Sequence, residues 1–494
     1  ACVVTLLGVA KLPVLRQLTA PLSLGVLALA LMATAAAGVP VPGDVQPPGV
    51  LVTQLSYFVR ALTLFVGALI LLVNWNLPAN DERGEFFGMM LFSIAGVTLT
   101  ASADDLVLLF FALELVSVPT YVLVALSRQD ARASEAAVKY FFLGALSAAV
   151  MVYGFSFLYG CAGTTSLSGA GGLAGYFASL TAFPVYAVIG LLFAFAGMAF
   201  KIAAVPFHAY APDVYEGAAS PVTGLLGFLP KLAGFVALIK LFEACNWNLP
   251  TSVYWLIWIV AAATMTVGNV LALLQTNVKR ILAYSSIAHS GYMLIGLLVG
   301  PVAGVGPLHD GVAALLFYIA VYGLMNLGAF AVLSAFAIRG NPIEDLTDLA
   351  GLSKRYPWSA MALAICAFSL MGFPPTAGFL GKVYIFSSAF SLPADHAFHG
   401  PLIVLAVIAV VNSAIAAVYY LRIATTAYLG AETEPVRPVP GYSVRVALAV
   451  CSLAMLFWFV WPAHLSDPAH QATSELARPV HARATQLALD QDRR

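Results

Sequence analysis

The chain has 494 residues, of which 61% are hydrophobic and 9% are charged, and its formal net charge is zero. Because so few charged side chains cannot cover the surface of a water-soluble protein of this size, the composition predicts a membrane protein. The zero net charge and the lack of a long basic tract exclude a nucleic-acid partner. The five cysteines are scattered without the CxxC spacing of a metal or iron–sulfur site, and we interpret them as small apolar residues of the interior.

Apolar segments long enough to cross a bilayer recur along the chain between short polar breaks. Because an apolar helix of about 20 residues spans a bilayer, we expect an all-α, polytopic bundle of about fourteen transmembrane helices. The count includes the opening string ACVVTLLGVA, which lacks the basic flank of a signal peptide and is interpreted as the end of a truncated first helix. The other spans are expected at residues 20–38, 52–74, 86–103, 105–126, 136–160, 184–210, 221–245, 252–274, 280–300, 311–338, 357–391, 401–428 and 443–462.

Lysines and arginines fall in every second predicted loop, and the intervening loops contain none. Loops rich in these residues lie on the cytoplasmic side of a membrane, so both chain termini are expected on the opposite side. The seventh loop departs from the pattern because it carries only the acids Asp213 and Glu216. The basic loop residues are Lys11, Arg16, Arg83, Arg128, Arg132, Lys279, Arg280, Arg339, Lys354, Arg355, Arg437 and Arg445.

Two predicted spans are overlong and interrupted by proline. Pro206 interrupts the span that contains Lys201, and Pro374 and Pro375 interrupt the span that contains Lys382. A proline removes a backbone donor and breaks a helix, and the freed carbonyls then need water or polar partners. Matched broken helices in the two halves of a membrane protein indicate a transport site. The alternative is that the prolines only kink the two helices and have no role in transport. The presence of a lysine beside each of the two breaks disfavours this alternative.

Four ionisable residues lie deep within predicted spans: Glu114, Lys201, Lys231 and Lys382. A lysine at the bilayer centre costs roughly 2.5–3.5 kcal/mol on insertion scales, so each is a candidate functional residue. Glu114 should be neutral or should face a cation. Lys139 is the nearest candidate partner of Glu114 in chain order. Glu114 is also expected to be the partner that sets the pKa of Lys201.

Further polar residues have a functional and a structural interpretation. Lys139 could instead extend to the cytoplasmic interface. His208 would share a helical face with Lys201 if Pro206 did not disturb the register. His289 and Tyr292, in the string YSSIAHSGYM, form a polar patch that is either part of a transport path or a hydrogen-bond network between helices.

The residues near span ends are expected to be structural. Lys240 should extend to the interface, and Arg60 and Arg422 should support helix ends. The polar tail after Pro462 is expected to be exposed to solvent; it contains His464, His470, Arg478, His481 and Arg483. The string GAGGLA at 169–174 has no preceding strand, so we interpret its similarity to a dinucleotide-binding motif as chance.

The row of buried lysines is better suited to carrying protons than to carrying metal cations. Burial disfavours the charged form of a lysine and a nearby carboxylate favours it, so a change at one partner alters the proton affinity of the other. Such groups can pass protons along water. A metal cation such as sodium would prefer carboxylate and carbonyl ligands, and lysines would repel it.

Several strings resemble the antiporter-like membrane subunits of bacterial NADH:quinone oxidoreductase, respiratory complex I. The resemblance covers nearly the whole chain from the second helix onwards, and the motifs are specific to this family. They are FALELVSVPTYVLVAL, EAAVKYFFLGALSAAVMVYGFSFLYG, FKIAAVPFHAYAPDVYEGAASPV, LLQTNVKRILAYSSIAHSGYMLIG and FSLMGFPPTAGFLGKVYIF.

The resemblance implies fourteen helices with two inverted five-helix repeats, each containing a broken helix, around a hydrated axis of charges. It gives an N-terminal region at 1–85, repeats at 86–245 and 252–428, and a last helix with a tail at 429–494. Glu114, Lys201, Lys231 and Lys382 match the family's proton-path residues. Lys139 and His208 match positions with subsidiary roles.

The implied function is proton translocation driven by quinone reduction in other subunits. NADH, FMN, iron–sulfur clusters and quinone are then expected in partner subunits, with no cofactor or metal in this chain. The expected location is the bacterial inner membrane, in contact with the lipid bilayer and with neighbouring antiporter-like subunits. Alternatives are a subunit of a multi-subunit cation/proton antiporter or of a membrane-bound hydrogenase, and a membrane scaffold that conducts nothing.

Overall fold

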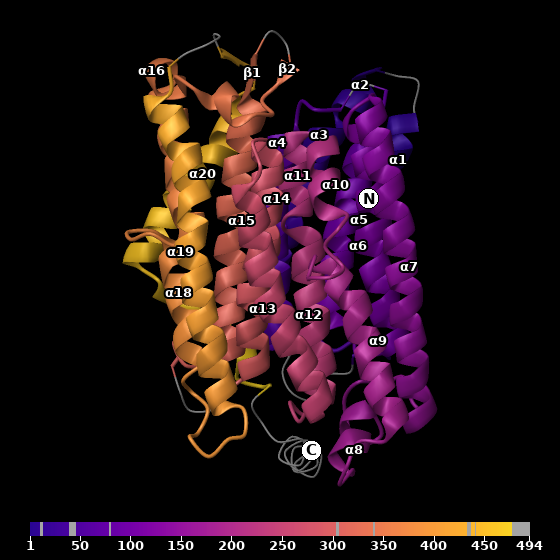
Figure 1. Cartoon of the computed structure of the whole chain (residues 1–494). Helices are drawn as coiled ribbons and strands as arrows, with labels where there is room; N and C mark the ends of the chain where they lie inside the picture. Colours follow the sequence, from indigo (N-terminus) through magenta and orange to yellow (C-terminus); the bar gives the residue numbers. More distant parts are fainter. Residues whose placement is uncertain are drawn as a thin grey trace.

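A computed structural model describes residues 1–9, 13–38, 46–78, 81–302, 306–338, 341–431, 436–439 and 441–476. Most of them form long helices that run roughly along one axis (Figure 1). Eleven helices of this described part are long and apolar enough to cross a membrane, and two shorter apolar helices are Val185–Lys201 (α9) and Pro357–Met371 (α17). The predicted all-α, polytopic membrane class is confirmed. The count of fourteen spans and the inverted repeats stay predictions.

The elements follow one another as a series of helices with few strands. The first twelve helices are α1 Cys2–Val9, α2 Pro13–Gln17, α3 Thr19–Ala37, α4 Gln54–Asn74, α5 Arg83–Ser102, α6 Leu106–Ser127, α7 Ala131–Ala162, α8 Leu173–Ala178, α9 Val185–Lys201, α10 Ala211–Gly217, α11 Ser220–Leu226 and α12 Leu229–Ala244. The later elements are α13 Thr251–Leu273, α14 Val278–Val299, α15 Gly311–Ala335, β1 Phe336–Ile338, β2 Asn341–Pro342, η1 Leu346–Leu349, α16 Leu352–Arg355, α17 Pro357–Met371, α18 Ala377–Ser388, α19 His399–Leu429, β3 Arg437–Pro438, α20 Tyr442–Val460 and α21 Ala463–Thr473.

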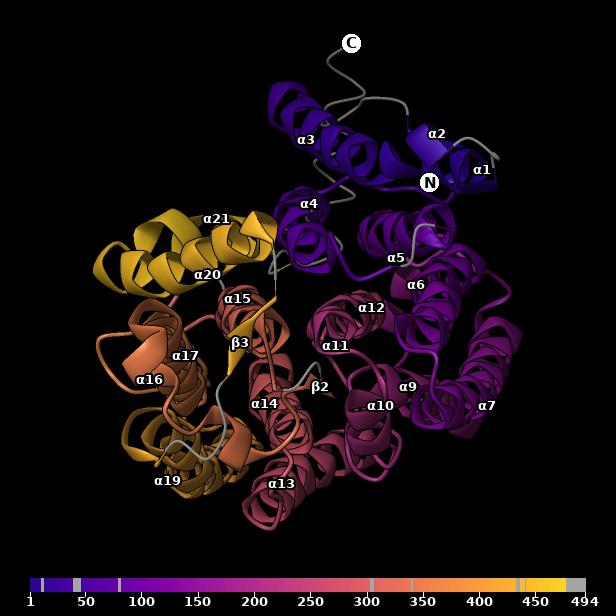
Figure 2. The same ribbon diagram turned by 90° about the horizontal axis from the view of Figure 1, so that it is seen from above.

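Three helical segments form the centre of the bundle. Viewed along the helix axis, α11 with α12, α14 and α15 lie inside a ring of the other helices (Figure 2). The apolar windows of Ser220–Ala244, Val278–Val299 and Gly311–Ala335 are 100% buried, whereas that of Tyr442–Val460 at the periphery is 28% buried. Side chains on the central helices are therefore shielded from lipid on every side.

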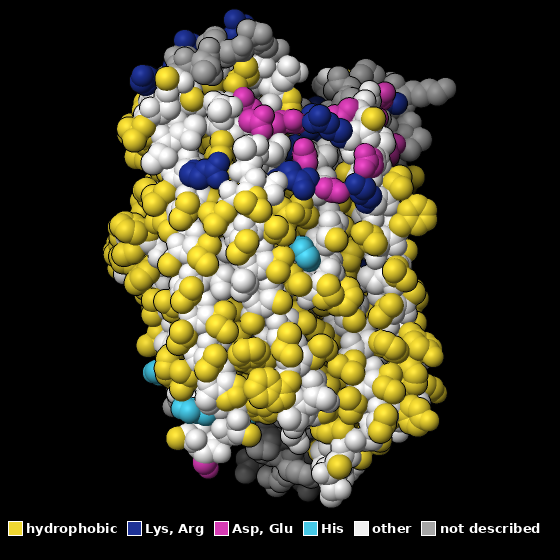
Figure 3. Space-filling model, viewed as in Figure 1, with side chains coloured by type: hydrophobic (Ala, Val, Ile, Leu, Met, Phe, Trp, Pro, Cys, Tyr) yellow, Lys and Arg dark blue, Asp and Glu magenta, His cyan; other side chains and the backbone are white. Residues whose placement is uncertain are grey.

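Charged side chains gather at one end of the molecule. On the face shown in Figure 3, lysines, arginines and acids lie together at the end that carries β1 and β2, above a broad band of hydrophobic side chains. Arg128 after α6 and Lys279 at the start of α14 meet there, because both lie within ion-pair distance of Glu344. This agrees with the alternation of basic loops, although the side of the membrane stays a prediction. Lys11 and Arg339 lie outside the described residues.

Both predicted helix breaks are present. α9 ends at Lys201, and the chain resumes a helix only at Ala211. α17 ends at Met371, and its C-cap Gly372 has φ +82°, a left-handed conformation that side chains with a Cβ rarely adopt. α18 starts again at Ala377. The two interruptions therefore place Lys201 and Lys382 beside irregular backbone inside the bundle.

A third interruption was not predicted. We expected one continuous helix over 221–245, but α11 ends at Leu226 and α12 begins at Leu229. Pro230 at the start of α12 has no amide hydrogen to donate, and a Cβ on Gly227 would lie 2.1 Å from the side-chain nitrogen of Asn326. The interruption ends at Phe228, three residues before Lys231. Lys201, Lys231 and Lys382 therefore each lie near a helix break.

A small sheet at the charged end was also missed. β1 pairs antiparallel with β2 and with β3, in the order β2-β1-β3. The span expected over 311–338 instead ends as a helix at Ala335. Strands of two or three residues carry no readable alternation, and β3 lies far along the chain from β1, so no local pattern could indicate their pairing.

The expectation of a solvent-exposed tail is met at His464, which is exposed, but is wrong for one face of residues 463–476. They include helix α21, whose Leu465, Ala469 and Ala472 are buried. Thr473 donates a hydrogen bond of 2.6 Å to Asp310, the N-cap residue of α15. The apolar positions at Leu465, Ala469 and Ala472 recur at helical spacing, which is the signal that the overall polarity of the tail concealed. Arg478, His481 and Arg483 lie outside the described residues.

Candidate functional site

Glu114 and Lys201 form a buried ion pair between α6 and α9. Lys201 is the last residue of α9, and its Nζ donates to Glu114 Oε1 at 2.7 Å and to Ser117 Oγ at 2.5 Å. The side chains are 3% and 20% exposed. The structure thus contains the pair that the sequence analysis expected. A buried pair of this kind is costly to separate, and separating it changes the proton affinity of both groups.

Lys231 on α12 has only neutral partners among the described residues. Its Nζ donates to the carbonyl oxygen of Ser286 and, at 2.7 Å, to Ser290 Oγ, both on α14. The ring centroid of Tyr322 lies 5.7 Å from the same nitrogen. Neutral oxygens can accept hydrogen bonds from a lysine in either protonation state, so this site can hold or release a proton without losing a counter-ion.

A small cavity separates Lys201 from Lys231. Its volume is ≈ 10 Å³, which is about the space that one water molecule needs. Its remaining wall is formed by Tyr140, Ala203, Tyr210, Ala211, Val214, Tyr215 and Leu226. A single water there would connect the two lysines, and α10 supplies much of the wall.

His289 on α14 lies between two tyrosine hydroxyl groups. Its Nδ1 is 2.6 Å from the Tyr318 hydroxyl and its Nε2 is 2.9 Å from the Tyr420 hydroxyl. Tyr420 is also hydrogen-bonded to Ser285. The two nitrogens of a neutral imidazole are one donor and one acceptor, so the ring can take a proton on one side and give it up on the other.

Lys382 on α18 lies against the end of α17. Its Nζ donates to the carbonyl of Met371 at 2.7 Å and to Ser413 Oγ at 2.8 Å. Unpaired carbonyls at a helix C-terminus favour a cation. The Tyr292 ring centroid lies 5.2 Å from the same nitrogen. Tyr292 is on α14, so this helix contacts both Lys231 and Lys382.

Sequence reasoning missed the residues that organise this part of the site. Tyr318, Tyr420, Tyr419 and Asn269 were not singled out. Asn269 donates to Tyr292 at 2.9 Å and accepts from Tyr419 at 2.9 Å. The only signal available was a polar group within an apolar span, since a buried hydroxyl or amide normally finds a hydrogen-bond partner.

Among the described residues, Lys139 and His208 form no hydrogen bond or ion pair with Glu114, Lys201, Lys231 or Lys382. Lys139, which we expected as a candidate partner of Glu114, instead contacts Asp213 and Glu135, each at 2.8 Å, and its side chain is 42% exposed. His208 lies in the segment between α9 and α10. The face it would share with Lys201 does not form, because α9 ends at Lys201.

Lys240 does not extend to the interface as expected. It is 5% exposed, and its charge acts on Asp104, which lies between α5 and α6. Burial raises the pKa of Asp104, while the Ser168 hydroxyl and the Lys240 charge oppose this change. Arg422 supports a helix end as expected, because it donates to the carbonyl of Leu273 at 3.0 Å.

Comparison with known proteins identifies the family. Residues 103–416 match the family described as NADH:quinone oxidoreductase/Mrp antiporter, TM. NADH-quinone oxidoreductase subunit N of Rhodospirillum rubrum is 39% identical over 426 residues, 85% of this chain and 83% of that protein. A chain of respiratory complex I from Thermus thermophilus, solved with bound aureothin, is 30% identical with a TM-score of 0.77, over 94% of this chain and 96% of its own length.

A more distant structure has the same fold. A chain of the Mrp complex from a Dietzia species has a TM-score of 0.79 and 20% identity, over 98% of this chain and 99% of its own length. At that identity the likeness shows the fold alone, so it does not separate an antiporter from a complex I subunit. The sequence relatives do make this distinction, because they are named as subunits of NADH-quinone oxidoreductase. The chain therefore belongs to the NADH:quinone oxidoreductase/Mrp antiporter membrane family, on the branch of NADH-quinone oxidoreductase subunit N.

Proposed function

We propose that this chain is the proton-translocating membrane subunit of a respiratory NADH:quinone oxidoreductase. The observation that carries the proposal is the buried series Lys201, Lys231, His289 and Lys382, in which each group faces neutral hydrogen-bonding groups or one carboxylate. The relatives named subunit N support the assignment to this complex.

The proton path begins at the ion pair. Opening of the Glu114–Lys201 pair lowers the hold of Lys201 on its proton, because the carboxylate no longer stabilises the charged lysine. The proton then crosses the cavity on one water and is accepted by a neutral Lys231. This step needs little movement, because the cavity has space for about one water molecule.

The second part of the path runs along α14. Lys231 is bound to Ser286 and Ser290 on that helix, and His289 lies on the same helix between two tyrosine hydroxyls. His289 passes the proton on towards Lys382, which lies over Tyr292. Lys382 releases it when its neighbours change their charge or hydration. Tyr292 positions Lys382 through its ring.

The driving force comes from other subunits. We propose that NADH, FMN, iron–sulfur clusters and quinone are bound there, that this chain has no redox centre of its own, and that conformational or electrostatic change reaches Glu114 through neighbouring membrane subunits. The complex then acts as a translocase in the bacterial inner membrane, with both termini of this chain on the non-cytoplasmic side.

Co-purification and ion specificity test the proposal. An affinity tag on this chain should recover NADH dehydrogenase subunits from detergent-solubilised membranes. In vesicles containing that complex, NADH oxidation should acidify the lumen at the same rate in sodium-free buffer and in sodium buffer. Recovery of antiporter subunits with sodium-dependent proton movement would instead show the cation/proton antiporter. Proton movement unaffected by loss of the lysines would show a scaffold.

A further inference from the structure

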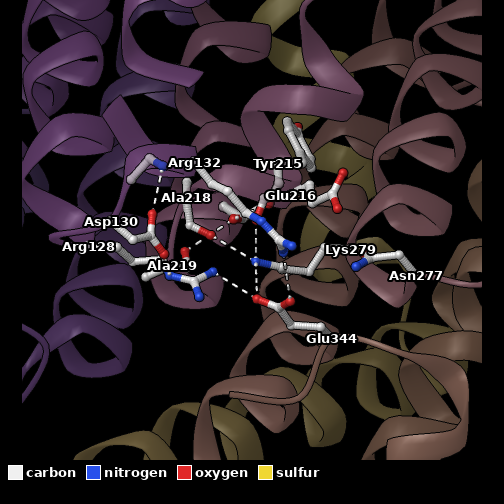
Figure 4. A network of polar contacts seen from close by, with 12 residues as sticks. Arg128, Asp130, Arg132, Tyr215, Glu216, Ala218, Ala219, Asn277, Lys279 and Glu344 are labelled. Atoms are coloured by element: carbon white, nitrogen blue, oxygen red, sulfur yellow. Dashed lines mark hydrogen bonds and ion pairs between the residues drawn. The ribbon is translucent and has the colours of Figure 1, made fainter. Parts of the chain in front are cut away.

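A network of ion pairs surrounds α10 at the charged end of the molecule. We call it the α10 clasp and define it as Arg128, Asp213, Glu216, Lys279, Arg280 and Glu344. Asp213 and Glu216 lie on α10, and Lys279 and Arg280 lie in the first turn of α14. Figure 4 shows Lys279 between the end of α10 and the carboxylate of Glu344.

Lys279 holds the C-terminal end of α10. Its Nζ donates to the carbonyl of Glu216 at 2.5 Å and to that of Ala218 at 3.1 Å, and its side chain is 1% exposed. The last carbonyls of a helix have no partner within the helix, and a cation there is favourable. The lysine thus ties the start of α14 to the end of α10.

The other members fix the sides of the clasp. Arg280 Nη1 lies 2.9 Å from Asp213 Oδ1 and 2.7 Å from Glu216 Oε2. Glu344 Oε1 lies 2.9 Å from Arg128 and 3.8 Å from Lys279, and the Glu344 carbonyl accepts from the Val278 amide at 2.8 Å. Residues from both halves of the chain therefore converge on one short helix.

The inner side of α10 forms a wall of the cavity between Lys201 and Lys231. Its N-cap Tyr210 and its residues Ala211, Val214 and Tyr215 line that cavity. α10 has seven residues, whereas isolated helices shorter than about 12–15 residues are marginal in water. Its position must come from its contacts, of which the clasp and the ion pair between Lys139 and Asp213 are the charged part.

We infer that the α10 clasp sets the position of α10 and thereby the width of the water site between Lys201 and Lys231. Lys279 and Glu344 are positioning residues in this account, since neither lines the cavity. The consequence for transport rests on the proposed function. A cavity of ≈ 10 Å³ has no spare space, so a displacement of α10 on the order of 1 Å changes whether one water fits.

Chemical labelling at the cavity wall tests the inference without relying on transport. Val214 is fully buried, and Val214→Cys places a thiol at the cavity wall. The assembled complex, in vesicles with the charged end outward, is treated with a charged methanethiosulfonate, and mass spectrometry quantifies labelling on the peptide that carries position 214. Lys279→Met and Glu344→Gln are each combined with this cysteine. Lys354→Met is the matched control, because Lys354 is exposed near the same end on α16 and outside the clasp.

We expect labelling at position 214 to be at least fivefold faster in both clasp variants than in the parent and in Lys354→Met. Lys279→Arg, which keeps the charge, should return labelling most of the way to the parent rate. If Lys279→Met does not assemble, the milder Glu344→Gln carries the test. Parent-like labelling in the clasp variants would overturn the inference.

Proton pumping by the same variants, measured without the cysteine, separates the inference from the proposed function. Faster labelling together with a fall of several-fold in protons pumped per NADH supports both. Faster labelling with unchanged pumping supports the inference that the clasp positions α10, but contradicts the proposed proton path through this cavity.

Discussion

Lys201 Nζ lies 2.7 Å from Glu114 Oε1, although 87 residues separate them in the chain. The pair joins the end of α9 to the middle of α6, beside the first helix break. Because one partner lies on each side of a helix interface, movement of either helix changes the proton affinity of both groups.

Removing either partner of this pair should abolish transport. Lys201→Met leaves the Glu114 carboxylate buried without its cation, which we expect to lower the free energy of unfolding by about 3 kcal/mol. Proton pumping in reconstituted vesicles should fall at least tenfold. The double variant Glu114→Gln, Lys201→Met should recover thermal stability but not pumping. Pumping restored in the double variant would show that the pair is only structural.

The hydroxyl of Tyr420 should matter for proton transfer through His289. Tyr420→Phe removes a partner of His289 Nε2 and of Ser285. An unsatisfied buried group costs about 1–3 kcal/mol, so a small loss of stability should accompany a loss of about tenfold in pumping rate. Tyr442→Phe is the control, since Tyr442 is 83% exposed. Equal pumping by the two variants would contradict a role for Tyr420.

Gly372 should tolerate no side chain. Its φ of +82° disfavours a Cβ, and that Cβ would lie 2.7 Å from Cδ of Lys382. We expect Gly372→Ala to lower the free energy of unfolding by about 1–2 kcal/mol and to slow pumping by displacing Lys382. Gly400→Ala is the matched control, because nothing lies within 4 Å of a Cβ there. Thermal unfolding and pumping assays on both variants check this, and a parent-like Gly372→Ala would be the contrary result.

The docking of α21 should depend on pH through Asp310. Burial raises the pKa of this carboxyl above 3.8, against the opposing hydrogen bonds from the Ala313 amide and Thr473. The folded state therefore binds the proton more tightly than the unfolded state does, and stability falls as pH rises from about 3.8 to the raised pKa of the folded state. At pH values above that raised pKa, the free energy of unfolding no longer changes with pH through Asp310.

Asp310→Asn should remove this dependence, because asparagine keeps the N-cap but carries no charge. Asp310→Ala, which also loses the cap, should be less stable than Asp310→Asn by about 1 kcal/mol. Thermal unfolding across the pH window, with the exposed Asp467→Asn as control, measures both effects. An identical pH slope in the parent and in Asp310→Asn would contradict the assignment.

The sequence was sufficient for the membrane class and for the two predicted breaks, because an apolar length and a proline act locally. Lys201, Lys231 and Lys382 were found because each lysine is conspicuous within an apolar run. The pairing of Glu114 with Lys201 followed from the same reasoning. Lys139 was a poorer candidate, since its true partner Asp213 lies on α10, a short helix whose position depends on the break after α9.

Other features depend on contacts that no local pattern records. The partners of His289 come from α15 and α19, and a tyrosine in an apolar helix is too common to indicate them. Lys279 was identified only as a basic loop residue, whereas its burial follows from the position of α10. The docked tail helix α21 was missed because the interpretation rested on the overall polarity of the tail. The apolar residues that recur there every three or four positions were not considered.

Lys231→Met is the most direct test of the central claim, because Lys231 has no carboxylate partner among the described residues and its loss strands no buried charge. In the reconstituted complex, protons pumped per NADH should fall at least tenfold, while NADH oxidation by a soluble electron acceptor proceeds at the parent rate. A parent ratio of protons to NADH in Lys231→Met would contradict proton movement along the buried lysines.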